Sequence, residues 1–247
     1  MRAVAPALHV RSASRARAGL VLLHGVMSHA GWFASLREEL AARGVSSIAV
    51  DRRGSGAATL SPGICDADAW AADVAAAVTQ LRTELDRVAL FGWCWGARGA
   101  LVAATQLPIE HLILAAPGIA MAEAVRARAL ELAAAPGDPV ALPFPIEAFS
   151  DDPSVLSWIR NDERAWRSQP RAFLPVSRAL LEEALAAIPA LRVPVTTFLA
   201  AQDRIVDNDR IAALLPGHPV QVLPGGHALV LESPALVAER TVAAILP

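Results

Sequence analysis

The hydrophobic residues of this chain fall into short apolar runs, separated by segments whose apolar positions recur at helical spacing. The runs at 19–23 and 88–91 are apolar throughout, which is typical of strands buried on both faces of a parallel sheet. On this pattern we expect strands at 8–10, 19–23, 45–50, 87–91, 111–115, 193–200 and 220–223.

Helical patterns alternate with these runs. In 31–43 the residues Trp32, Leu36 and Leu40 share one face, and Gly44 follows as a C-terminal glycine. The alanine-rich segment 66–85 predicts a long helix capped by Asp66 or Asp68. Further helices are expected after 96, at 210–215 and at 234–246. Strand and helix in alternation predict an α/β fold, with a mostly parallel central sheet flanked by helices.

The alternation breaks after the strand at 111–115. From 119 to 189 no strand is expected, and the pattern is one of helices and loops with four prolines between 136 and 145. We therefore expect a core made of 1–118 and 190–247, with 119–189 inserted as a helical lid or cap.

Composition narrows the function. The chain has 247 residues and a net charge of −2, which gives no reason to expect a nucleic-acid partner. No run is long enough to span a membrane. Two cysteines, Cys65 and Cys94, do not make a disulfide framework, so a cytoplasmic location is expected. The histidines lack metal-ligand spacing and no dinucleotide fingerprint is present, so no metal and no cofactor are expected.

Three candidate catalytic residues follow predicted strands, at the sheet edge where α/β proteins bind ligands. Cys94 is the centre of Gly92-Trp93-Cys94-Trp95-Gly96, which has the G-x-S-x-G spacing of a nucleophile elbow between strand and helix. Asp203 follows the strand at 193–200, and His227 follows the strand at 220–223. A thiol nucleophile needs a base, and the base needs an orienting acid. Asp207 and Asp209 are rival acids that lie further from the strand end.

Taken together, these motifs make the chain resemble an α/β-hydrolase along nearly its whole length. The insertion and the segment 149–153 are similar to the lid of the monoacylglycerol-lipase and serine-aminopeptidase branch. The landmarks are His24-Gly25-Val26, Asp51-x-Arg53-Gly54-x-Gly56, Gly92-x-Cys94-x-Gly96, Asp203-x-Ile205-Val206 and Gly226-His227.

The resemblance implies a triad in which Cys94 is the nucleophile, His227 the base and Asp203 the orienting acid. It also implies an oxyanion hole formed by the backbone amides of Val26 and Trp95. His24, Asp51, Arg52 and Arg53 are expected to brace the loops around the site. That branch normally has serine at the elbow, often preceded by histidine, where this chain has Cys94 and Trp93.

A cysteine changes the chemistry, because its acyl-enzyme is a thioester that amines and carbanions attack readily. The chain thus resembles the Dieckmann cyclases and thioesterase-like enzymes, and we expect an acyl-transfer enzyme that releases or cyclises an acyl chain from a thioester donor. No arginine stands at an evident carboxylate-binding position, and the aromatic insertion suggests a sizeable apolar substrate. The expected substrate-binding residues are Trp93, Phe144, Phe149, Trp158 and Trp166.

Two alternatives stay open at this point. One is a cysteine hydrolase of esters, lactones or thioesters, similar to dienelactone hydrolases or lipases. The other is a non-catalytic ligand-binding protein on the same fold. The expected partner is a small-molecule or carrier-protein-bound acyl substrate. The acyl chain, the acceptor, the oligomeric state and whether Cys94 replaces a native serine are open as well.

Overall fold

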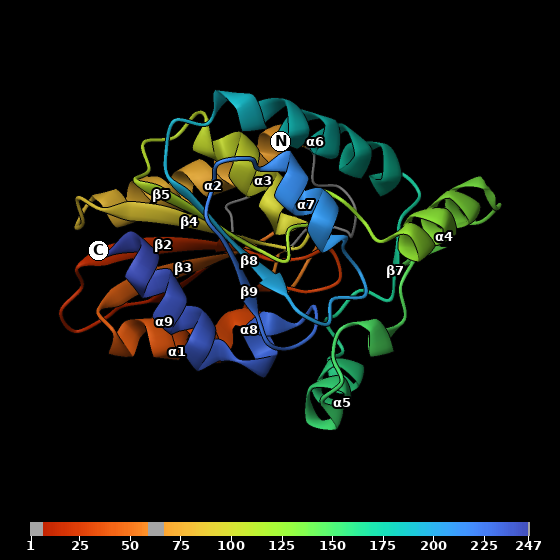
Figure 1. Ribbon diagram of the computed structural model, residues 1–247, viewed down its shortest axis with the longest axis horizontal. Helices are drawn as coiled ribbons and strands as arrows, with labels where there is room; N and C mark the ends of the chain where they lie inside the picture. The colour runs from red at the N-terminus through yellow and green to blue at the C-terminus, as the bar shows by residue number, and fades with distance from the viewer. Residues whose placement is uncertain (1–6, 59–66, 247) are drawn as a thin grey trace.

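The computed structural model describes residues 7–58 and 67–246, and Cys65 and Asp66 lie outside this part of the chain. A seven-stranded sheet runs through it in the order β1-β3-β2-β4-β5-β8-β9 (Figure 1). Its strands are β1 (Ala7–Arg11), β2 (Ala18–Leu23), β3 (Val45–Asp51), β4 (Val88–Trp93), β5 (His111–Ala115), β8 (Val195–Ala200) and β9 (Val220–Leu223).

Each strand expected from the apolar runs is present in this sheet. In this sheet β3, β2, β4, β5, β8 and β9 each pair in parallel with their neighbours in that series. The edge strand β1 pairs antiparallel to β3, with Leu8 opposite Val50. All residues of β2, β3 and β4 are buried, because helices cover both faces of the sheet there. The prediction of a mostly parallel α/β sheet flanked by helices is confirmed.

Helices form a layer on each side of the sheet. On one side lie α1 (Ala34–Ala42), α8 (Leu229–Glu232) and α9 (Pro234–Ile245), and on the other lie α2 (Ala67–Arg82) and α3 (Gly96–Ala104) (Figure 1). The short helix α7 (Asn208–Leu214) links β8 to β9. Among the described residues, no helix is both long and apolar enough to cross a membrane.

The helices predicted at 31–43 and 66–85 differ from the observed ones near their N-terminal ends. The segment 31–43 starts as a 3-10 turn, η1 (Ala30–Phe33), and continues as α1. Gly44 follows with φ of +78°, the left-handed conformation expected of a glycine after a helix. Asp68 lies inside the first turn of α2 rather than at its cap.

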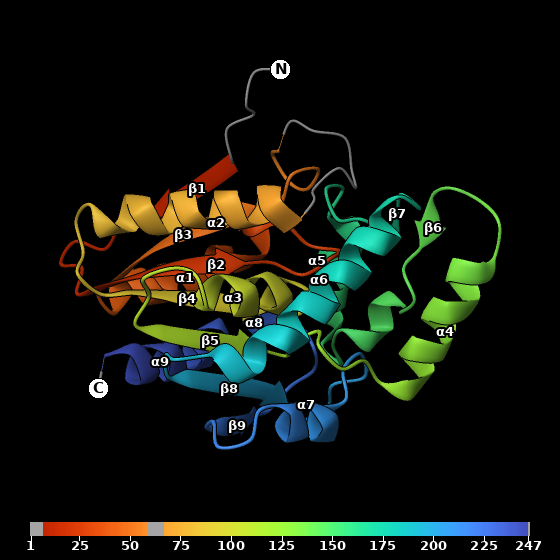
Figure 2. The same ribbon diagram turned by 90° about the horizontal axis from the view of Figure 1, so that it is seen from above.

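The segment between β5 and β8 is mainly helical. It contains α4 (Glu123–Ala134), α5 (Pro153–Asn161) and α6 (Phe173–Ala187), with the short turns η2 (Ile146–Ala148) and η3 (Ile188–Ala190). Helix α6 packs along α3, whereas α4 and α5 extend past one end of the sheet (Figures 1 and 2).

The expectation that this segment holds no strand was wrong. Two-residue strands, β6 (Val140–Ala141) and β7 (Ser168–Gln169), pair antiparallel in a small separate sheet. Strands this short leave no apolar alternation in the sequence. Their pairing is supported by contacts distant in sequence, such as the hydrogen bond that Arg171 Nε donates to the Gly137 carbonyl at 2.7 Å.

Glycines let the helix after β4 approach the sheet closely. A Cβ at Gly96 would lie 2.2 Å from the Leu23 carbonyl oxygen, and one at Gly92 would lie 2.5 Å from the Cα of Ala97. Both neighbours are backbone atoms that cannot rotate away. The two glycines are therefore required where α3 crosses the carboxyl end of β2.

We expect Gly96→Ala to destabilise the fold by about 3 kcal/mol or more, because the new methyl group overlaps backbone. This corresponds to a melting temperature lower by about 6–12 °C for a chain of this length, measured by circular dichroism. Gly217→Ala is the control: its Cβ meets nothing within 4 Å and carries only the penalty of φ +79°, about 1 kcal/mol. Equal losses in the two variants would contradict the packing argument.

Candidate active site

Cys94 occupies a strained position between β4 and α3. Its φ is +53°, in the left-handed region that a residue with a side chain rarely adopts. Three backbone groups hold it there: the Cys94 amide donates to the Ala115 carbonyl at 3.1 Å, and the Cys94 carbonyl accepts from the amides of Ala97 at 3.1 Å and Gly118 at 2.8 Å. This is the backbone geometry of a nucleophile elbow, with the thiol at the carboxyl end of the sheet.

His227 and Asp203 form a fully buried pair beside this thiol. Nδ1 of His227 lies 2.9 Å from Oδ2 and 3.1 Å from Oδ1 of Asp203. The other ring nitrogen, Nε2, is buried and makes no hydrogen bond of normal geometry within the described residues. Asp207, a rival acid in the sequence, instead caps α7 by accepting from the Arg210 amide. The structure thus brings Cys94, His227 and Asp203 together.

Charge stabilises the protonated form of His227. Burial lowers the pKa of His227, but the negative charges of Asp203 and Cys94 outweigh it and raise the pKa to about 10. Burial raises the pKa of Asp203, yet the charge of His227 and hydrogen bonds from the Ile205 and Val206 amides leave it below its ordinary value. The arrangement favours the imidazolium form of His227.

The loop after β2 lies directly against Cys94. A Cβ at Gly25 would lie 3.1 Å from the Cβ of Cys94 and 3.5 Å from its Sγ. Arg52 Nη2 donates to the Val26 carbonyl at 3.1 Å, which fixes the peptide of this loop. In the described part of the chain, neither the Val26 amide nor the Trp95 amide donates a hydrogen bond. These two amides, which have no acceptor, could donate hydrogen bonds to an oxyanion formed at the thiol.

His24 shapes this loop as a neutral side chain. Its Nδ1 donates to the Gly25 carbonyl at 2.8 Å, and its Nε2 accepts from the Arg52 amide at 3.0 Å. Burial, aided by the charge of Arg52, lowers the pKa of His24 to about 3. A nitrogen that must accept cannot carry a proton, so the bonds and the pKa agree.

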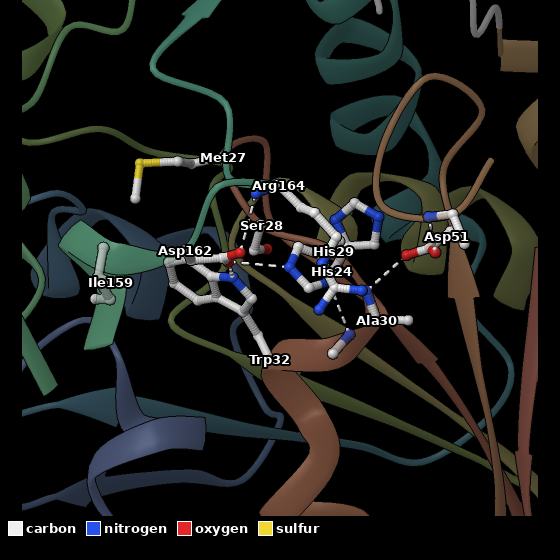
Figure 3. Close-up of polar contacts among 12 residues, drawn as sticks. His24, Met27, Ser28, His29, Ala30, Trp32, Asp51, Ile159, Asp162 and Arg164 are labelled. Atoms are coloured by element: carbon white, nitrogen blue, oxygen red, sulfur yellow. Dashed lines mark hydrogen bonds and ion pairs between the residues drawn. The ribbon is translucent and has the colours of Figure 1, made fainter. Parts of the chain in front are cut away.

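A second network ties the same loop to the insertion (Figure 3). His29 Nε2 and Trp32 Nε1 both contact Oδ2 of Asp162, at 2.9 and 2.7 Å. Asp51 accepts from the Ala30 amide at 2.7 Å. Sequence reasoning missed the pair of His29 and Asp162, because 133 residues separate them and neither belongs to a motif.

Arg52 is buried in an aromatic cage, in keeping with its expected role as a brace. Its guanidinium carbon lies 4.1 Å from the ring centre of Trp166, 4.6 Å from that of Phe173 and 5.0 Å from that of Trp95. Cation–π contacts of this kind stabilise a desolvated guanidinium. Arg53 pairs with Asp73 through two hydrogen bonds of 2.8 and 2.7 Å.

A cavity of about 560 Å³ opens onto Cys94, Val26 and Trp95. Its walls come largely from the insertion, with aliphatic side chains of α4 and α6. Phe144 also lines it, as expected for a substrate-binding residue. The main aliphatic contributors are Val125, Ala129, Leu130, Leu142, Leu174 and Leu181.

The other four aromatic residues expected to bind substrate do not line this cavity. Trp93 points into the core, where its Nε1 donates to the His227 carbonyl at 3.0 Å. Phe149 packs edge-on against His227, with ring centres 5.4 Å apart. Trp158 is 43% exposed and packs on Trp32, away from Cys94. Trp166 covers Arg52. The aromatic residues of the sequence therefore indicated the inserted segment, but they did not predict which of its side chains face the cavity.

Arg98 is the cavity residue that the sequence did not reveal. It lies four residues after Cys94 on α3, is 8% exposed and lines the cavity. Arg98 belongs to none of the sequence motifs, so the sequence did not mark it as a residue of the cavity wall.

An enzyme of the α/β-hydrolase type is supported by these features: a strained cysteine at the elbow, a buried His–Asp pair and, in the described part of the chain, two amides without acceptors at the end of a parallel sheet. The chain belongs to the Hydrolase_4 family, described as serine aminopeptidase, S33, whose model matches residues 14–222. At the elbow position this chain has Cys94.

Solved structures with the same fold extend over nearly the whole chain. The monoacylglycerol lipase of Paleococcus ferrophilus is 17% identical, with a TM-score of 0.80 and coverage of 97% of this chain and 99% of that one. A soluble variant of the Saccharomyces cerevisiae monoglyceride lipase is 14% identical, with a TM-score of 0.79 and coverage of 100% of this chain and 94% of that one. An Exiguobacterium antarcticum esterase is 18% identical, with a TM-score of 0.73 and coverage of 98% of this chain and 96% of that one. Comparison with curated protein sequences finds no significant match.

The interaction between Cys94 and His227 should be measurable at the histidine. We expect Cys94→Ala to lower the pKa of His227, because one of the two groups that raise this pKa is lost, and Asp203→Asn to lower it further. NMR titration of nitrogen-labelled histidine measures both. His29 is the internal control, since the groups that shift its pKa do not include Cys94. An unchanged His227 pKa in Cys94→Ala would contradict the coupling.

The same pKa shift has a consequence for stability. Because the folded-state pKa of His227 lies above its ordinary value of 6.5, protonation stabilises the folded protein. That contribution is complete below pH 6.5 and is lost as the pH rises through about 10.

Proposed function

We propose that this protein is an acyl-transfer enzyme with a Cys94–His227–Asp203 triad, which takes an acyl chain from a thioester donor and releases or cyclises it. The observation that carries the proposal is the strained Cys94 at the cavity floor, beside a histidine whose Nε2 has no other partner among the described residues. A merely structural cysteine has no need of this arrangement.

The first step is acylation. The Cys94 thiolate attacks the thioester carbonyl carbon, and the C=O electron pair moves onto oxygen, which the Val26 and Trp95 amides receive. As the tetrahedral adduct collapses, the bond to the leaving sulfur breaks and His227 donates its Nε2 proton to that sulfur. Asp203 holds the ring by its Nδ1 hydrogen bond throughout. The acyl group is then joined to Cys94 as a new thioester.

The second step returns the cysteine. A nucleophile loses its proton to His227 and attacks the acyl carbonyl, and Cys94 leaves as thiolate. A carbon nucleophile within the same acyl chain would close a ring. The aliphatic walls of the cavity favour an internal nucleophile over water, because they hold the chain folded near Cys94 and offer water few partners.

The insertion is proposed to act as the lid, residues 119–189, over a core of 1–118 and 190–247. Its helices α4 and α6 provide half of the residues that line the cavity. The cavity volume of about 560 Å³ is in the range that holds a small molecule rather than a peptide chain.

A hydrolase is the second candidate function. It is favoured by the family and by the lipases and esterases that share the fold. The first step is the same, and water would then replace the internal nucleophile and release a free acid. The product identity separates the two candidates.

We expect wild-type protein mixed with acyl thioesters to gain the mass of one acyl group, detected by intact-protein mass spectrometry. Cys94→Ala should lose the adduct and at least about 10³-fold in kcat/KM, and His227→Ala should lose a similar factor. Cys65→Ala, which removes the other cysteine, is the control that keeps the adduct. A cyclised product supports acyl transfer, free acid alone supports the hydrolase, and full activity of Cys94→Ala rules out both.

The cavity predicts which aromatic residue affects substrate use. Phe144→Ala should raise KM for medium-length acyl thioesters about tenfold, because it removes an aromatic wall from the cavity. Trp158→Ala removes a larger ring that lies outside the cavity and should leave KM within about twofold. Steady-state kinetics on both variants measure this. A larger effect for Trp158 would place the substrate elsewhere.

A further inference from the structure

Arg98 is held rigidly in the wall of the cavity by three hydrogen bonds. Its Nε donates to the Gly118 carbonyl at 2.8 Å, and its Nη1 donates to the carbonyl of Ser177 at 2.8 Å and to its Oγ at 3.0 Å. Gly118 in turn donates to the Cys94 carbonyl at 2.8 Å. The guanidinium is thus fixed relative to the nucleophile through a single intervening residue.

The charge of Arg98 is not matched by an acid. All three acceptors are neutral oxygens, and within the described residues Arg98 forms no ion pair and its Nη2 donates no hydrogen bond. Nη2 is not sealed from solvent. The two other arginines of the cavity differ, because Arg126 pairs with Glu123 and Arg178 with Glu182.

A buried cation without an acid is costly unless something else compensates it. Burial lowers the pKa of Arg98 to about 10, and the charge of Cys94 opposes that change, so Arg98 stays charged at neutral pH. The cavity around it is lined mainly by apolar side chains. An open guanidinium nitrogen in such a cavity is a binding group for an anionic oxygen of the ligand.

We propose that Arg98 Nη2 binds an anionic oxygen on the acyl chain of the substrate, so that the protein prefers acyl groups that carry a carboxylate or an enolate close to the thioester carbonyl. Cys94 precedes α3 and Arg98 lies in its first turn, and both residues line the same cavity, so one ligand can reach both groups. The assignment rests on the proposed acyl-enzyme function and names its substrate class.

Binding to the Cys94→Ala background tests the carboxylate, because no acylation competes there. The probes are the N-acetylcysteamine thioesters of succinate and of levulinate, in which a neutral methyl ketone replaces the carboxylate at nearly equal size. Calorimetry should give the succinyl probe at least about tenfold tighter binding. Adding Arg98→Met should reduce the ratio to about one, while Arg98→Lys should keep part of it.

The enolate is tested with a second pair of probes. Acetoacetyl thioester can form the delocalised enolate between its two carbonyl groups, and its α,α-dimethyl analogue, which has no proton at that carbon, cannot. A preference for acetoacetyl that Arg98→Met abolishes identifies the enolate as the ligand, and a preference confined to the succinyl pair identifies the carboxylate. No preference in either pair overturns the proposal, and this comparison needs no Arg98 variant to fold.

Ser177→Ala separates recognition from a structural tie. It removes the hydroxyl that accepts from Arg98 and from Trp95 but keeps the guanidinium charge. The substrate preference should survive in this variant. If Ser177→Ala loses the preference as fully as Arg98→Met, Arg98 acts only by tying α3 to α6, and the proposal is wrong.

The proposed function and the role of Arg98 can fail separately. Whether the wild-type protein forms an adduct with the levulinyl thioester tests the role of Cys94 alone, because this probe carries no carboxylate for Arg98 to bind. An adduct with no anion preference overturns the role of Arg98 alone. An anion preference without any adduct upholds Arg98 as a binding residue and overturns the acyl-enzyme.

Discussion

The site depends on one constraint, the left-handed backbone of Cys94. A residue with a side chain holds φ of +53° only when its surroundings enforce it. Here the amide of Cys94 is bound by Ala115 at the end of β5, and its carbonyl is bound by Gly118 in the next loop. Cys94 is therefore positioned by the neighbouring strand and the loop after it. The same turn leaves the Trp95 amide without a hydrogen-bond acceptor in the described part of the chain.

Two cationic side chains interact with Cys94. His227, held by Asp203, provides a positive charge and carries the proton that the proposed reaction transfers. Arg98 provides a second positive charge, through a guanidinium that pairs with no described carboxylate. This division of roles is compatible with the proposed acyl-enzyme chemistry.

The insertion and the core are linked around the oxyanion loop. Trp166 donates its amide to the Met27 carbonyl at 2.8 Å, and Asp162 binds both His29 and Trp32. Ser177 on α6 binds Trp95 and Arg98. Because the insertion holds the loop, the elbow and the cavity wall at once, substrate contacts there can affect the geometry of the catalytic groups.

The sequence by itself determined the parallel sheet and the three residues that meet at its edge. Apolar runs mark buried strands regardless of what packs on them, and residues directly after parallel strands must gather at one edge. Cys94, Asp203 and His227 were therefore recoverable. Only the tertiary structure decided which side chains of 119–189 face the cavity. Phe144 lines it, whereas Trp158 and Trp166 do not, because contacts between segments distant in the sequence decide how the insertion packs on the core. The small sheet of β6 and β7 and the guanidinium of Arg98 were likewise decided only by the tertiary structure, because their partners are distant in the chain.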